Sequence, residues 1–69
     1  MDMDWKTRME DEAEELSSRV SRLDNFIGSR TFMQLSRGDQ QLLSAQQSAM
    51  KTYLTILNLR LMRAKSRPA

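Results

Sequence analysis

Apolar residues recur every three or four positions along most of this chain, the spacing that places them on one face of an α-helix. In the first third they form a heptad-like series made up of Trp5, Met9, Ala13, Leu16, Val20, Leu23 and Ile27. This series predicts one helix over residues 4–27 whose apolar stripe faces a partner helix. Gly28 suits the left-handed position that often follows the last turn of a helix.

Residues 29–35 are too few for a full helix and are expected to form a corner. Within them, Phe32 and Leu35 lie three positions apart, which is the spacing of a single helical turn that closes the end of a core. Because such a corner lets the chain reverse, we expect an all-α fold. The predicted architecture is an antiparallel two-helix hairpin with a short helical corner.

A second long helix is predicted to begin at Ser36. Ser36 and Asp39 have the spacing of a capping box, with Asp39 in place of the usual Glu or Gln. The helix is expected over about residues 37–65, followed by a frayed tail over residues 66–69. Its seam toward the first helix is predicted to consist of Leu43, Gln46, Met50, Tyr53, Leu57, Arg60 or Leu61, and Ala64.

This second helix is apolar on more sides than one neighbouring helix can cover. A surface helix normally carries a single apolar stripe about 100° wide. Further apolar positions here are Leu54, Ile56, Leu59, Leu61 and Met62. A single domain of 69 residues is also marginally stable. The chain is therefore expected to complete its core by forming a homo-oligomer, with any binding site assembled between copies.

The residue types present exclude several kinds of chemistry. The chain has no cysteine and no histidine, so disulfides, thiolate zinc sites and Ser-His or Cys-His catalysis are excluded. We therefore expect no enzymatic activity, no cofactor and no metal site. The acidic, polar opening is the reverse of a signal peptide, and no apolar run approaches the roughly 20 residues of a membrane span. A cytoplasmic protein without a membrane partner is expected.

Charge is unevenly distributed, although the formal net charge is only +2. Residues 1–15 carry seven acids and two bases, whereas residues 16–69 carry nine bases and two acids. An antiparallel hairpin would bring the acidic start beside the basic end, so the two could neutralise each other. The residues concerned are Asp4, Arg8, Glu12 and Glu15 at the start, and Arg60, Arg63, Lys65 and Arg67 at the end.

Pairs of carboxylates also occur at helical spacing in the acidic segment, namely Glu10 with Glu14 and Asp11 with Glu15. Such pairs could bind a hard cation or act in acid/base chemistry. Both roles need burial or further ligands from another element. We interpret these acids as structural and solubilising.

Aromatic and basic residues are expected to meet at the open end of the hairpin. Trp5 offers a flat face on which a base can stack, and the planar guanidinium of arginine matches phosphate oxygens. Two alternatives stay open: Trp5 could hold the helix ends together or contact another copy, and the arginines could pair with acids. A nucleic acid polymer is not expected, because the nearby acids would repel a long phosphate backbone. The candidate ligand-binding residues are Trp5, Arg8, Lys51, Tyr53, Arg60 and Arg63.

A longer pattern covers more than half of the chain, from Leu23 to Leu61. It reads Leu-x-x-Phe-Ile-x-Ser-x-x-Phe-x-x-Leu, followed by Asp-Gln-Gln-Leu-Leu-x-x-Gln-x-x-Ala-Met-x-x-Tyr-Leu-x-Ile-Leu-x-x-Arg-Leu. This pattern is similar to that of very small bacteriophage proteins. As a two-helix hairpin that oligomerises, the chain resembles the phage sponges that defeat CBASS and Thoeris immunity by sequestering cyclic nucleotide signals.

The resemblance implies compact hexamers that hold cyclic di- or trinucleotides between protomers and cleave nothing. Trp5 is a possible counterpart of the aromatic residue in anti-CBASS sponges, although the later first helix offers Arg19 and Arg22 and no lysine. Arg60 and Arg63 resemble, by placement, the anion-binding arginines of anti-Thoeris sponges. We therefore expect a sponge for a cyclic nucleotide messenger in the cytoplasm of an infected bacterium. The alternative is a structural or adaptor hairpin that docks on a partner protein.

Overall fold

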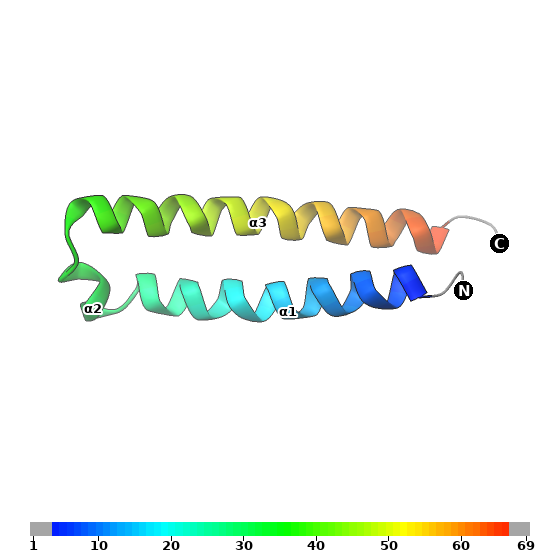
Figure 1. The fold of residues 1–69 in the computed structure, drawn as a ribbon, viewed down its shortest axis with the longest axis horizontal. Helices are drawn as coiled ribbons and strands as arrows, with labels where there is room; N and C mark the ends of the chain where they lie inside the picture. Colours follow the sequence, from blue (N-terminus) through cyan, green and yellow to red (C-terminus); the bar gives the residue numbers. More distant parts are fainter. Residues whose placement is uncertain (1–3, 67–69) are drawn as a thin grey trace.

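Two long helices pack against each other in an antiparallel hairpin and are joined through a short helical corner (Figure 1). The computed structural model describes residues 4–66 and contains α1 (Asp4–Ile27), α2 (Arg30–Met33) and α3 (Arg37–Ser66). The all-α class and the pairing of the two long helices are confirmed. Of the predicted frayed tail, Ser66 is the last residue of α3, and residues 67–69 lie outside the described part.

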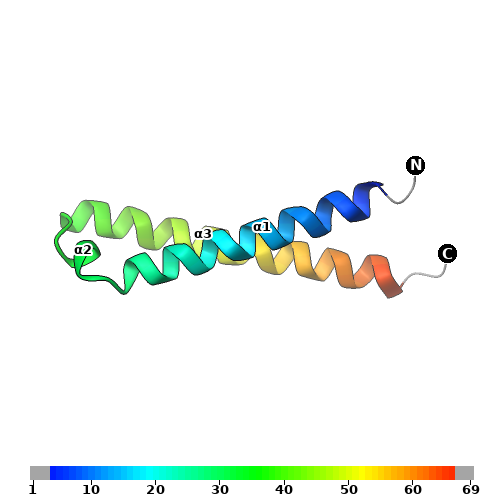
Figure 2. The same ribbon diagram turned by 90° about the horizontal axis from the view of Figure 1, so that it is seen from below.

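Figure 1 shows α1 and α3 side by side, and in both views the start of α1 and the end of α3 lie at the same end of the hairpin (Figures 1 and 2). We call this the open end, because α2 closes the other one. The molecule is 52 Å long and only 16 by 14 Å across. No helix among residues 4–66 is long and apolar enough to cross a membrane.

The stripe of α1 that faces α3 is the one that the heptad spacing predicts. Its members Met9, Ala13 and Val20 are buried, and the others that lie beyond the first turn are half-buried. Trp5, at the open end, keeps 45% of its surface exposed. The core is therefore a single narrow seam along the hairpin, and it is thinnest where Trp5 lies.

The stripe of α3 that faces α1 differs from the predicted one at two positions. Gln47 and Leu54 lie in the seam, whereas the predicted Gln46 and Tyr53 are exposed. The predicted and observed series both alternate three and four residues apart, but the observed one places the aliphatic Leu54 against α1 and leaves the tyrosine hydroxyl outside the seam. Leu61, not Arg60, packs against the core. The full seam is Leu43, Gln47, Met50, Leu54, Leu57, Leu61 and Ala64.

Side chains and backbone at the corner fix the reversal of the chain. The rings of Phe26 and Phe32 meet edge to face, with centroids 6.2 Å apart. The Ser29 hydroxyl accepts a hydrogen bond from the Phe32 amide at 3.3 Å and donates one to the Phe26 carbonyl at 2.6 Å. The Gln40 side-chain amide donates to the Phe32 carbonyl at 3.1 Å and also reaches two further carbonyls of the corner.

Gly28 does not adopt the left-handed conformation that was predicted for it. Its amide still donates to the Asp24 carbonyl at 3.1 Å, as in a continuing helix. Ser29 then caps α2 at once with an extended backbone. Because the next helix begins directly after this cap, the chain turns without a left-handed residue. The predicted cap of α3 is present, since the Ser36 hydroxyl accepts from the Asp39 amide at 3.2 Å.

Candidate functional site

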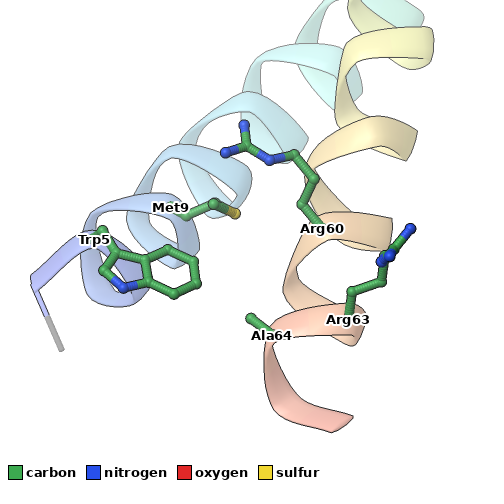
Figure 3. A pocket seen from close by; sticks show the side chains of 5 residues that line it. All are labelled: Trp5, Met9, Arg60, Arg63 and Ala64. Carbon is green, nitrogen blue, oxygen red and sulfur yellow. The ribbon is translucent and has the colours of Figure 1, made fainter. Parts of the chain in front are cut away.

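A pocket of about 340 Å³ lies at the open end, between the first turns of α1 and the last turns of α3. The close view shows the Trp5 indole projecting from α1 toward α3, while the Arg60 side chain reaches back toward α1 (Figure 3). Arg63 rises from α3 on the far side of the pocket and its guanidinium points outward. Met9 and Ala64 complete the lining.

The heptad spacing explains why an aromatic face is available here. Trp5 occupies the first seam position of α1, and Ala64 occupies the last seam position of α3. Both line the pocket, because the antiparallel hairpin brings the first seam position of α1 to the last one of α3. Because the alanine is small, it leaves the indole incompletely covered. A flat, half-exposed ring therefore lies beside two guanidinium groups.

A second pocket, of about 300 Å³, adjoins the first and shares Trp5, Met9 and Arg60 with it. Arg8 lines this second pocket, together with Glu12 and Leu57. Four of the six predicted site residues are thus gathered at the open end, and three of them are arginines. An anion that enters either pocket meets at least two cationic side chains.

Lys6 is a residue of this end that the sequence analysis overlooked. Its ammonium nitrogen lies 5.9 Å from the centroid of the Trp5 ring, within the range of a cation–π contact. The signal in the sequence is a lysine directly after the tryptophan. The contact adds positive charge close to the indole.

The acids of the open end whose side chains are described do not form ion pairs with the site arginines. Among the side chains of residues 5–65 the ion pairs are Arg19 with Glu15, at 2.6 Å, and Lys51 with Asp24, at 3.3 Å. Glu12 instead accepts a hydrogen bond from a tyrosine of α3. The described side chains therefore do not form the expected neutralisation of the basic end, and Asp4 and Arg67 lie outside them.

Tyr53 and Lys51, the other two predicted site residues, lie away from the open-end pockets. The Tyr53 hydroxyl donates to the Glu12 carboxylate at 2.5 Å. This hydrogen bond, together with desolvation, raises the pKa of Tyr53 above its usual value of 10.0. The tyrosine also lines a small cleft of about 120 Å³ near the middle of the hairpin.

Lys51 lies closer to the corner and contacts the Asp24 carboxylate, which also accepts a hydrogen bond from Gln47. The Gln47 hydrogen bond, with a further contribution from Lys51, lowers the pKa of Asp24 below its usual 3.8. Lys51 precedes Arg60 by nine residues, or about 14 Å along the helix axis. One hairpin therefore does not bring Lys51 to the ligand pocket.

Three of the four acids in the carboxylate pairs on α1, namely Asp11, Glu14 and Glu15, line a broad, open depression with Ser18 and Arg22. No group of three or more side chains within residues 4–66 is arranged to hold a metal ion. The open end is the place where aromatic and cationic groups converge, and it is the candidate ligand site.

Comparison with known proteins identifies one family. The model of the Sequestin family matches residues 3–63, which include α2, nearly all of the two long helices and all six predicted site residues. No curated protein and no solved structure matches the chain. The match agrees with the resemblance to phage sponges found in the sequence. The chain belongs to the Sequestin family.

Proposed function

We propose that this protein is a phage anti-defence sponge that binds a cyclic oligonucleotide immune messenger in the host cytoplasm and sequesters it without cleavage. The observation that carries the proposal is the open-end pocket, where the half-exposed Trp5 ring lies beside Arg60 and Arg63. Its family name, Sequestin, is consistent with sequestration.

The chemistry of the pocket suits a nucleotide. Stacking of a base on Trp5 contributes about 1–3 kcal/mol to binding, whichever base it is. A guanidinium can hold a phosphate through two parallel hydrogen bonds, which is the role we assign to Arg60 and Arg63. Arg8, in the adjoining pocket, supplies a third positive charge.

The groups that line the first pocket support binding without turnover. The chain has no histidine or cysteine, and the pocket lining offers an indole, a thioether, a methyl group and two guanidiniums. None of these is a general base at neutral pH, because arginine stays protonated. The messenger would leave the pocket chemically unchanged.

The proposal includes more than one copy of the chain. A pocket of about 340 Å³ is at the lower end of the roughly 300–1,000 Å³ found for small-molecule sites. A cyclic di- or trinucleotide would extend beyond it. In a homo-oligomer, such as the hexamer that the resemblance implies, Tyr53 or Lys51 of a neighbouring copy would complete the site.

The first experiment follows the fluorescence of Trp5, the single tryptophan, during titration with a panel of cyclic di- and trinucleotides. A messenger that stacks on the indole should change its emission, raise the thermal midpoint by mass action, and be recovered intact after denaturation. No change with any messenger, from a folded protein, would count against the sponge.

A matched pair of variants tests the site itself. Arg60→Glu with Arg63→Glu should abolish binding, whereas Arg22→Glu with Arg30→Glu changes the net charge equally at residues that do not line the pocket. Both proteins are first checked for helix content and mass in solution. Binding that survives the first double substitution at physiological salt would show that the ligand lies elsewhere.

An adaptor hairpin is the second candidate function. Large apolar side chains remain exposed on α3, with Ile56 at 46%, Leu59 at 53% and Met62 at 64% of their surface. Such a surface could dock on a different protein. A monomeric mass in solution, together with no response to any messenger, would favour this alternative.

A further inference from the structure

The outer side of α3 carries a second regular stripe. Its members alternate three and four residues apart, as in a coiled-coil seam, and all are exposed in the hairpin. Leu42, for example, keeps 70% of its surface exposed. The stripe lies on roughly the opposite side of the helix from the seam with α1. It consists of Leu42, Ala45, Ala49, Thr52, Ile56 and Leu59.

Charge is also unusually sparse on this helix. Between Asp39 and Arg60 the only charged residue is Lys51, whose ammonium group contacts Asp24 of α1. The outer side of α1 is different, because it carries acids and arginines along most of its length. A helix face that meets only water normally has charged residues. The outer side of α3 therefore has the composition of a covered surface.

We propose that a second copy of this chain covers the stripe, with the two α3 helices antiparallel. In one common register, Leu42 meets the partner's Leu59 and Ala45 meets the partner's Ile56. Ala49 then meets the partner's Thr52, and two-fold symmetry repeats each contact. Every alanine meets a larger residue, so the two surfaces interlock without a large gap.

The charges at the ends of the stripe agree with the same register. Asp39, in the first turn of α3, comes beside the partner's Arg60, in the position that flanks an antiparallel seam. The pair occurs twice in the dimer. A parallel arrangement would instead place Arg60 beside the partner's Thr55, and this ion pair would not form. Exposed ion pairs add little affinity, but they select the antiparallel orientation.

The proposed dimer goes beyond the proposed function, because the two copies associate without a ligand. It nevertheless bears on the pocket, since Arg60 lines the pocket and lies at the end of the stripe. Each dimer would have its two open-end pockets at opposite ends, each beside the partner's corner. Failure of nucleotide binding would leave the dimer intact, so the two proposals fail separately.

Cysteine crosslinking tests the register directly, because the natural chain contains no cysteine. Ala45→Cys with Ile56→Cys should form a covalent dimer on oxidation. The two positions are about 16 Å apart within one helix, which is too far for a bond inside one chain. Ala45→Cys alone is the control and should not crosslink, since the two copies of this position are also far apart. Crosslinking by the single variant would overturn the antiparallel arrangement.

The mass in solution tests the surface itself. The unmodified protein should sediment as a dimer or a higher assembly of dimers, with a mass that falls on dilution. Ala49→Glu should shift the mass to the monomer, whereas Asn58→Glu, an exposed change outside the stripe, should not. A monomeric mass for the unmodified protein at all concentrations, or equal effects of the two variants, would overturn the proposal.

Discussion

Leu57 should account for more of the hairpin's stability than any other large side chain of α3. It is 1% exposed and packs with Met9 and Ala13 at the centre of the core cluster. Leu→Ala substitutions in protein cores cost about 2–5 kcal/mol, depending on how far the site can collapse. The seam between two helices is thin and can adjust, so we expect Leu57→Ala to cost about 2–3 kcal/mol.

In a domain of this size, that loss corresponds to a fall of the thermal midpoint by about 10–20 °C. The assay is thermal unfolding followed by the helical circular dichroism signal. Leu59→Ala is the matched control, because it makes the same chemical change two residues away on a side chain that is 53% exposed. Changes at such exposed sites usually stay within about 0.5 kcal/mol.

Leu59 also lies on the proposed dimer stripe, so the comparison is made over a range of protein concentrations. The effect of Leu57→Ala should persist at every concentration, whereas an added effect of Leu59→Ala should appear only where the protein associates. Equal losses from the two substitutions in dilute, monomeric protein would refute the assignment of the seam on α3.

Three further predictions concern polar contacts. Glu12→Gln should lower the pKa of Tyr53 toward 10, as measured by the absorbance of the single tyrosine. In the natural protein the contact between Tyr53 and Glu12 stabilises the fold below pH 10, and this contribution is lost as the pH rises through the raised pKa. The contacts that lower the pKa of Asp24 stabilise the fold above pH 3.8, and this contribution is lost as the pH falls through the lowered pKa. Asp24→Asn should therefore flatten the acid side of a curve of unfolding free energy against pH. Gln40→Ala should cost about 1 kcal/mol in denaturant unfolding, because three carbonyls of the corner lose a donor, whereas the exposed Gln41→Ala should cost little.

The hairpin could be predicted from periodicity because α1 has only one apolar stripe, so its choice of seam is unambiguous. The seam of α3 was harder to assign, since neighbouring stripes of this helix are both rich in apolar residues. Tyr53 and Leu54 are both plausible seam residues by type. The structure selects Leu54, because the seam that contains it also contains Leu61 and buries more apolar surface than a seam with Tyr53 and Arg60. Spacing alone does not distinguish them, because each residue belongs to a series that alternates three and four residues apart.

The open-end pocket followed from the register, since antiparallel pairing necessarily brings Trp5 near the last turns of α3. The positions of the Lys51 and Tyr53 side chains depend on individual polar contacts with residues of α1. Asp24 and Glu12 hold these two side chains along the hairpin, and periodicity contains no information about such individual contacts. Lys6 was overlooked because a residue adjacent to a seam position points away from the seam in a helical pattern, although its long side chain still reaches the indole.

The distribution of charge over the two helices connects the pocket with self-association. α1 carries charges along its outer side, as a helix in contact with water should, whereas α3 leaves an uncharged stripe that ends at Arg60. Covering this stripe with an antiparallel copy would leave both α1 helices outermost. It would also bring the partner's Asp39 to the edge of each pocket, where an incoming phosphate would compete with it for Arg60. Ligand binding by the assembled protein should then be stronger in Asp39→Asn, an effect that a pocket formed by one isolated hairpin would not show.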